Sequence, residues 1–180
     1  NGVTSVVIKS VDGAETAKMS TKVAVVTNFS FNNINASGSL DTDKQIALTD
    51  YDMLTSLSSS NPKKLNDGDP NTYIYSYLYY DPQFVIKFKS AKTLSGVGIL
   101  SSFTSYGYGV KKVTVETSLD GKVWTSMGTA TTSTQYDDDT TFPIVFSSPV
   151  KCQYVRLSNL ETFDTGDYPC FAISEIGAYE

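Results

Sequence analysis

Six residues, 66–71, combine oxygen-bearing side chains with residues that turn the backbone, and they read NDGDPN. Gly accepts a positive φ and Pro fixes φ without offering an N–H, so this segment cannot continue a helix or a central strand. Asp67, Asp69 and Asn71 alternate along it, a spacing that can place oxygens around one hard cation such as Ca²⁺. The residues alone leave two interpretations open, a solvated turn and a calcium loop.

The positions that follow exclude an EF-hand. Counted from Asp67, the sixth position of such a loop must be Gly and is Thr72, and the twelfth must be a bidentate Glu and is Leu78. Evidence from outside the loop is therefore needed to choose between the two interpretations.

The composition is typical of a β protein. The chain has 180 residues, of which 40% are apolar and only 18% charged, with twelve Tyr. This length supports one well-buried core, so we expect one principal domain.

The charge and the missing residue types exclude several classes of function. A net charge of -5 and a single Arg, Arg156, argue against a nucleic-acid partner. The chain has no His, which removes the usual general base, the commonest zinc ligand and the Ser-His and Cys-His pairs. A carboxylate-pair enzyme has no motif to support it, so we expect no enzymatic activity.

No apolar run approaches the ~20 residues that cross a bilayer, so we expect no transmembrane segment. The chain begins at Asn1 rather than Met, so we expect a fragment or processed form of a larger protein. The two cysteines, Cys152 and Cys170, leave two interpretations open. A bridge would close a loop of about 18 residues and contribute ~3 kcal/mol, and the alternative is two small buried apolar side chains.

Short β-branched and alternating runs predict eight strands of a sandwich or barrel. They cover residues 52–58, 84–88, 96–101, 112–117, 124–130, 141–145, 154–158 and 173–179. We predict a main domain over 46–180 and an N-terminal extension over 1–45, with strands at 3–11 and 23–31 and an Asn- and Ser-rich boundary from 32. The extension is either extra strands on the main body or the tail of a preceding domain.

Several segments in this order point to one family. The hairpin VTVETSLDGKVW at 113–124 carries a strand followed by Ser-x-Asp-Gly-x-x-Trp, and the loop 58–73 carries Asp-Gly followed by Thr. This hairpin and this loop, together with the predicted strands at 81–88, 94–100, 154–157 and 172–179, resemble the discoidin family. This family is also called the coagulation factor 5/8 type C domain, and it includes bacterial galactose-binding-like carbohydrate-binding modules. The resemblance covers about residues 46 to 180.

The resemblance implies an all-β fold, an antiparallel eight-stranded jelly-roll β-sandwich, here with extra N-terminal strands, and no catalysis. Many bacterial members hold a structural Ca²⁺ at the Asp-Gly loop. Carried over by position, its ligands are the Lys64 carbonyl, Asp67, Asp69, Thr72 and Glu175. These are hard oxygens from two distant segments, so an ion would tie the loop to the last strand.

The family's sugar site lies in loops at one end of the sandwich, and there this chain departs from the pattern. Members that bind galactose-type sugars pair a His and an Arg or Asn with an aromatic platform. Here there is no His, Arg156 sits in a closing strand, and Ile74 stands where the family often has Trp. The chain offers tyrosines instead, whose apolar face and hydroxyl suit a sugar.

The candidate sugar-binding residues are Tyr75, Tyr106, Tyr108, Phe163 and Tyr168, and the same stretches also hold Tyr77, Tyr79, Tyr80 and Phe171. Ordinary packing is the alternative for each. The tyrosines of 73–80 alternate with Ile74, Ser76 and Leu78, so one of the two sets could face the core. Tyr106 and Tyr108 are favoured for exposure because glycines flank them.

We therefore expect a non-catalytic carbohydrate-binding module with a structural calcium site, monomeric within a larger glycan-handling protein that is extracellular, periplasmic or attached to the cell surface. The expected partner is a glycan that contains galactose or hexosamine. The alternative is a protein- or lipid-surface interaction or spacer domain, which the missing His and loop Arg favour.

Overall fold

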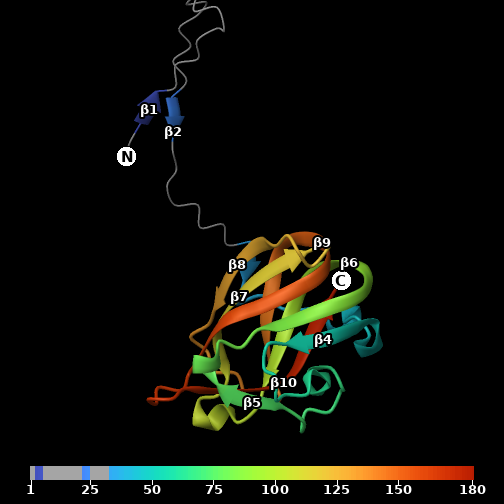
Figure 1. Cartoon of the computed structure of the whole chain (residues 1–180), viewed down its shortest axis with the longest axis vertical. Coiled ribbons are helices and arrows are strands. Elements are labelled where there is room, and N and C mark those ends of the chain that lie inside the picture. Colours follow the sequence, from blue (N-terminus) through green and yellow to red (C-terminus); the bar gives the residue numbers. More distant parts are fainter. Residues whose placement is uncertain (1–2, 6–21, 25–32) are drawn as a thin grey trace, which may run out of the picture. The chain divides into compact units, whose positions relative to one another are not determined.

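A computed structural model describes residues 3–5, 22–24 and 33–180 of the chain (Figure 1). The chain divides into two compact units, Asn1–Ser30 and Phe31–Glu180. In the first unit, β1 (Val3–Ser5) and β2 (Lys22–Ala24) form an antiparallel pair. These strands overlap the predicted runs 3–11 and 23–31, whose other residues lie outside the described part of the chain.

The second unit is an antiparallel β-sandwich, and short 3-10 turns lie in the connections between its earlier strands. Its strands are β3 (Ile34–Asn35), β4 (Tyr51–Thr55), β5 (Ile74–Tyr77), β6 (Phe84–Ser101), β7 (Val110–Ser118), β8 (Thr125–Thr131), β9 (Thr141–Thr162) and β10 (Cys170–Tyr179). The turns are η1 (Thr42–Lys44), η2 (Leu48–Asp50), η3 (Pro62–Leu65), η4 (Leu78–Tyr80) and η5 (Thr104–Tyr106). None of the helices in the described ranges is long and apolar enough to cross a membrane.

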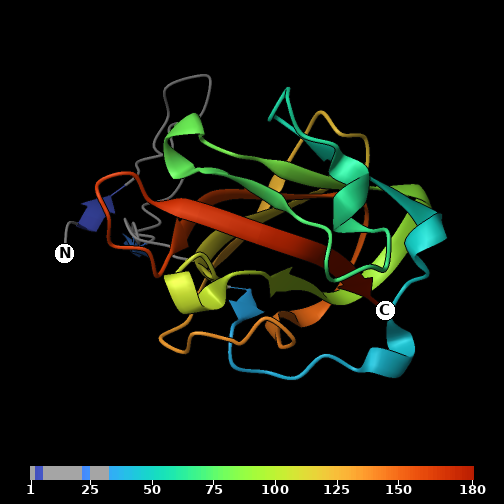
Figure 2. The same cartoon turned by 90° about the horizontal axis from the view of Figure 1, so that it is seen from below.

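Two long strands, β6 and β9, run through both layers of the sandwich. Their first and second halves have different neighbours, because each strand turns a corner between the layers. One layer contains β4, β6, β9, β7 and β8, and the other contains β5, β10, β6, β9 and β3. Figure 2 shows β10, in red, between β5 and the second half of β6. The predicted jelly-roll sandwich is confirmed.

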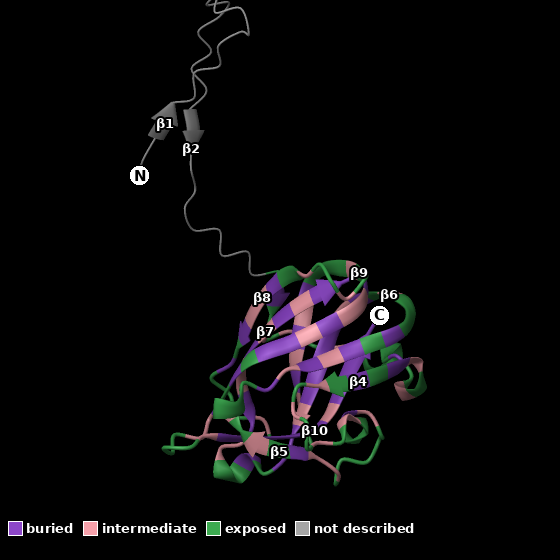
Figure 3. Cartoon of the chain, in the orientation of Figure 1, coloured by how far each residue is buried: buried purple, intermediate pink, exposed green. Residues whose placement is uncertain are grey.

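The core lies between the two layers and follows the period-two alternation of the strands. In β6, Phe84, Ile86 and Phe88 are fully buried, whereas the residues between them are exposed or half-buried. β10 is different, because nine of its ten residues are buried, with only Glu175 half-buried. Figure 3 shows this strand as an almost continuous buried ribbon. A polar carboxyl within such a strand needs a partner.

Most of the predicted strands are present, but not as separate segments. The predicted runs 84–88 and 96–101 are both parts of β6, and 141–145 and 154–158 are both parts of β9. Between these runs, residues 92–94 remain paired with residues 150–152 across the corner, with Lys92 opposite Cys152 and Leu94 opposite Val150. β3 and β5 were not among the eight predicted strands.

Residues 33–45, placed by the sequence in the N-terminal extension, pack with the sandwich. β3 pairs with β9, and Gln45 forms a bridge to Tyr179 of β10. This part of the extension therefore belongs to the second unit.

Cys152 and Cys170 are both buried and both free. The bridge is therefore not formed: Cys152 is a small buried apolar side chain, the second of the two interpretations that the sequence left open, whereas Cys170 Sγ lies 3.1 Å from the Tyr75 hydroxyl. Burial raises the pKa of the Cys152 thiol to about 12.

Candidate functional site

The loop that follows η3 is fixed at its base. Leu65 is fully buried in the core, and the Asn66 side-chain amide donates to the carbonyl oxygens of Leu48, at 3.2 Å, and Tyr51, at 3.0 Å. Gly68 then adopts φ = 78°, a conformation that other residues rarely accept. The loop therefore returns sharply toward its own start.

This return brings several oxygens together around the Thr72 hydroxyl. Its Oγ1 lies 2.8 Å from Asp67 Oδ2, 3.4 Å from the Lys64 carbonyl oxygen and 3.3 Å from the Asp69 carbonyl oxygen. Adjacent ligands of one Ca²⁺, each 2.3–2.6 Å from the ion, lie about 3.3–3.7 Å apart at right angles. The spacing of these oxygens is thus close to that of a calcium ligand set.

Glu175 of β10 completes this group from the other end of the sequence. Its Oε1 accepts a 2.8 Å hydrogen bond from the Gly68 N–H. Burial, and then the adjacent Asp67 carboxyl, raise the pKa of Glu175 to about 7 despite that hydrogen bond. Two carboxyls that face each other in a partly buried position form a place where a cation is favourable.

Asp69 enters the group through its main chain. Its carboxylate instead accepts from the Asn71 backbone N–H, at 3.0 Å, and side-chain amide, at 2.9 Å, which closes a local turn. The structure thus brings together all five predicted metal-site residues, with Asp69 contributing its carbonyl. Within the described ranges no three His, Cys, Asp or Glu side chains cluster as a metal site, so this group depends on carbonyl and hydroxyl oxygens as well as carboxylates.

Three of the five predicted sugar-binding residues meet on the surface beside β5. The Tyr75 and Tyr108 ring centroids are 5.6 Å apart, and Tyr106 stacks on Tyr108 at 5.8 Å with an interplanar angle of 27°. Tyr75 is 44% exposed and Tyr106 69% exposed, whereas Ile74 is buried. The alternation in β5 therefore turns Ile74 to the core and the tyrosines to solvent. We call Tyr75, Tyr106 and Tyr108 the tyrosine cluster.

The 102–109 loop, which carries Tyr106 and Tyr108, is held in place by neighbouring segments. Asp138 caps η5 by accepting from the backbone N–H groups of Phe103, at 3.2 Å, and Thr104, at 2.8 Å. Gly107 adopts φ = 85°, and a Cβ there would lie 2.9 Å from the Asp164 nitrogen. The 102–109 loop is thus held against the 163–169 loop by a contact that only glycine permits.

Within the described residues, no ring contact joins the other two predicted sugar-binding residues, Phe163 and Tyr168, to the cluster, although the backbone of Phe163 lies against Gly107. Phe163 is half-buried with Lys111 Nζ 5.7 Å from its ring centroid. Tyr168 is 71% exposed on the 163–169 loop, and its carbonyl oxygen lies 3.3 Å from Cys170 Sγ. Phe171, which the sequence also offered, is fully buried and packs against Phe84, so it belongs to the core.

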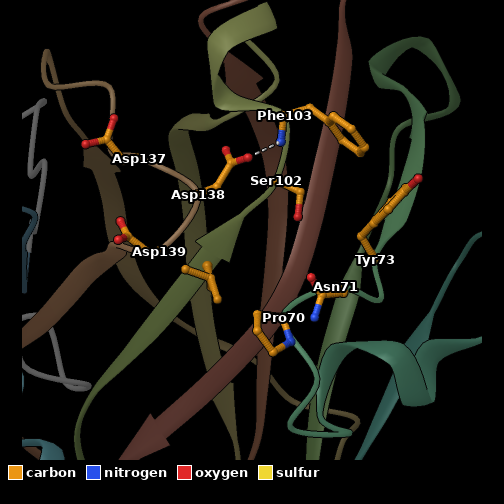
Figure 4. Close-up of a pocket in the computed structure, with 9 residues that line it drawn as sticks. Pro70, Asn71, Tyr73, Ser102, Phe103, Asp137, Asp138 and Asp139 are labelled. Carbon is orange, nitrogen blue, oxygen red and sulfur yellow. Dashed lines mark hydrogen bonds between the residues drawn. The ribbon is translucent and has the colours of Figure 1, made fainter.

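A groove of about 820 Å³ lies between the Asp-Gly loop and the end of β6 (Figure 4). Its lining residues are Pro70, Asn71, Tyr73, Leu100, Ser102, Phe103, Asp137, Asp138 and Asp139. Tyr73 and Phe103 were not among the predicted sugar-binding residues. Their rings meet edge to face, with centroids 4.9 Å apart. The sequence could have indicated them, because they lie in the same two stretches as the predicted tyrosines.

Arg156 serves a different part of the fold. It pairs with Glu116 at 2.6 Å, directly opposite it on β7, and its guanidinium lies 4.3 Å from the Trp124 ring centroid. The single Arg of the chain is therefore engaged in the β7–β9 sheet and is not part of the tyrosine cluster.

Fold and site together define an antiparallel β-sandwich module with an oxygen-rich loop tied to its last strand and an aromatic cluster on β5 and the neighbouring 102–109 loop. The sequence model of the F5/8 type C domain matches residues 33–176, which is most of the chain. The chain therefore belongs to the F5/8 type C domain family, as the resemblance predicted.

Solved structures with a similar fold include several bacterial proteins. A two-domain protein of unknown function from Bacteroides fragilis has a TM-score of 0.70 and 20% identity, over 83% of this chain and 48% of that one. This chain thus spans about half of that protein. CBM32-3 from a family 31 glycoside hydrolase of Clostridium perfringens has a TM-score of 0.63 and 21% identity, over 76% and 95%. The family 32 module of C. perfringens NanJ, in complex with galactose, has a TM-score of 0.61 and 15% identity, over 76% and 98%. A comparison with curated protein sequences finds no match.

Proposed function

We propose that this chain is a non-catalytic carbohydrate-binding module. The observation that carries the proposal is the tyrosine cluster, a group of aromatic rings without charged members, two of them exposed, on β5 and the neighbouring 102–109 loop. Such rings present a flat apolar face and a hydroxyl at a low entropy cost. The apolar face suits the C–H face of a sugar, and the hydroxyl suits the sugar's own hydroxyl groups. The NanJ module, which has the same fold, is in complex with galactose, and galactose and N-acetylgalactosamine are therefore the first ligands to test.

A structural calcium ion is the second part of the proposal. The residues present fit the ion, because hard oxygens from Lys64, Asp67, Asp69, Thr72 and Glu175 lie in one group. A bound ion would neutralise the facing carboxyls and tie the loop to β10. Its role in this proposal is to hold the fold, and no chemical step depends on it.

Binding is tested by isothermal titration calorimetry with galactose, N-acetylgalactosamine and oligosaccharides that contain them, in the presence of calcium. Removal of a ring at the centre of a binding site typically costs about 1–2 kcal/mol or more, so Tyr106→Ala and Tyr108→Ala should each weaken binding roughly 5- to 30-fold. Tyr154→Ala is the matched control, because Tyr154 packs on Trp124 at the opposite end of β7. Binding that is indifferent to both cluster variants would contradict the proposal.

The setting that we propose is a larger glycan-handling protein, secreted or attached to the cell surface. The support is that two similar structures are also modules, one of them from a glycoside hydrolase. Fractionation of the producing cells, with an antibody against the sandwich, tests this: detection only inside the cytoplasm would contradict it.

One observation favours a second candidate function. Arg156 is paired with Glu116 and stacked on Trp124, and the chain has no His. The His and Arg that family members use to bind galactose-type sugars are therefore missing from the tyrosine cluster. The exposed rings would then meet a lipid or protein surface. Sedimentation with phosphatidylcholine and phosphatidylserine vesicles distinguishes the candidates, because a glycan-binding module should remain in solution.

A further inference from the structure

The tyrosine cluster is the middle of a longer series of aromatic side chains in ring contact. In spatial order the series is Tyr73, Phe103, Tyr106, Tyr108, Tyr75, Tyr77, Tyr79 and Tyr80, and we call it the aromatic strip. The centroids of rings in contact are 4.0 to 6.5 Å apart along its whole course. The strip thus extends beyond the cluster on both sides.

Most of the strip is accessible. Six of the eight rings are exposed: Tyr79 by 62%, Tyr80 by 56%, Tyr106 and Tyr75 as given above, and Tyr77 and Phe103 by just over a third. The other two, Tyr73 and Tyr108, are half-buried. In β5, Tyr75 and Tyr77 are two positions apart and thus point to the same face of the strand. A ligand can therefore pass from one ring to the next without leaving the surface.

The strip is also uncharged and held in shape. Hydrogen bonding to Tyr80, followed by desolvation, raises the pKa of Tyr79 to about 12, so its hydroxyl stays protonated at neutral pH. Phe103 adopts φ = 53°, a conformation that a bulky residue accepts only under constraint, and Asp138 holds its N–H (Figure 4). Asp81, with φ = 48°, ends η4 directly after Tyr80. The backbone therefore constrains the strip at Phe103, next to Tyr73, and directly after Tyr80.

We propose, on the basis of the carbohydrate-binding function above, that the aromatic strip binds several consecutive sugar units of one linear, uncharged glycan chain. A pyranose ring is about as wide as a phenol ring, so each aromatic ring supports at most one sugar. A single terminal sugar would use only the tyrosine cluster and leave the outer rings in water. An uncharged chain matches a strip made only of Tyr and Phe, and its far end would enter the groove at Tyr73 and Phe103.

The choice of a glycan over an apolar partner follows from the tyrosines. Seven of the eight rings carry a hydroxyl, and hydroxyls at the rim of each ring can bond the alternating polar groups of a sugar chain. The Tyr75 hydroxyl already lies 3.1 Å from Cys170 Sγ and that of Tyr79 bonds Tyr80, but an apolar protein groove or lipid tail would remove the remaining hydroxyls from water without supplying polar partners, at a cost in free energy.

The test uses the full chain with calcium and a panel of neutral linear polysaccharides, together with size-graded oligosaccharides of the best binder and its monosaccharide. Affinity should rise with oligosaccharide length before it levels off. Tyr79→Ala combined with Tyr80→Ala should weaken binding of the long oligosaccharide roughly tenfold and leave the monosaccharide unchanged. Tyr79→Phe keeps the ring and should retain most of the affinity, and Tyr154→Ala serves as the control.

The outcomes separate this inference from the function on which it rests. Monosaccharide binding that depends on Tyr106 and Tyr108 but gains nothing from chain length, and is indifferent to loss of Tyr79 and Tyr80, overturns the inference and leaves carbohydrate binding intact. Absence of binding to every glycan, or binding to phosphatidylcholine vesicles alone, overturns both.

Discussion

Removal of calcium should lower the stability of the sandwich by a measurable amount. The proposed ligands lie on a loop and on β10, so the ion would bind only the folded protein and stabilise it by mass action. At a calcium concentration of about 100 times the Kd, this stabilisation is about 2.7 kcal/mol. For a domain of this size, about 2–4 °C of melting temperature corresponds to each kcal/mol, so chelation should lower the melting temperature by about 5–11 °C.

The structure predicts which side chains carry this effect. Asp67→Asn removes a carboxylate that lies against the Thr72 hydroxyl and should abolish most of the calcium-dependent increase in melting temperature. Asp69→Asn should retain it, because the Asp69 side chain is turned to Asn71 and only its main-chain carbonyl joins the group. Glu175→Gln should lose the increase without lowering stability in the chelator, since its half-buried carboxyl faces that of Asp67.

The assay is differential scanning calorimetry of each variant in calcium and in EDTA, with calcium titration calorimetry to count bound ions. Glu161→Gln is the control, because Glu161 is an exposed carboxylate paired with Lys112 on the sheet. Equal melting temperatures of the unmodified protein in calcium and in EDTA would show that no calcium ion stabilises the fold. Equal losses for Asp67→Asn and Asp69→Asn would refute the assigned ligand atoms.

Three further predictions concern the scaffold. Gly107→Ala should cost about 1–3 kcal/mol of unfolding free energy in urea and weaken glycan binding, because of its positive φ and the close Asp164 nitrogen; unchanged stability would show that the loop contact is loose. Arg156→Ala should cost about 1–2 kcal/mol through its ion pair and its stacking on Trp124, yet leave glycan affinity unchanged, and a loss of affinity would place Arg156 in the binding site. In the native protein neither thiol should react with Ellman's reagent at pH 8, because burial raises the Cys152 pKa to about 12 and Cys170 is also buried; two thiols should react in denaturant, and fewer would indicate a disulfide.

The sandwich could be predicted from sequence because its strands carry period-two alternation and its family carries recognisable hairpins. The corners could not. Residues 89–95 and 147–153 are mostly polar and look like turns, yet residues 92–94 pair with residues 150–152 and keep β6 and β9 joined across the corner. β3 has only two residues, too few for any periodic pattern.

The candidate metal site shows the same limit. The Asp-Gly-Asp segment is visible as a local pattern, but Glu175 joins it from more than a hundred residues away, and only a resemblance could supply that pairing. The choice between the carboxylate and the carbonyl of Asp69 depends on a hydrogen bond to Asn71 that spacing does not reveal. Likewise, alternation in β5 left open which set of side chains faces water, and burial of Ile74 decides it.

β10 has a consequence for how the two proposed ligands affect each other. Its first residues, Cys170 to Ile173, pair with β5 beneath the tyrosines, and Glu175 follows two positions later. Ligands that favour the same ordered strand are thermodynamically linked, and the linkage is reciprocal. If bound calcium raises the affinity for a glycan by some factor, a bound glycan must raise the affinity for calcium by the same factor. The calcium concentration of the surroundings would therefore regulate glycan binding.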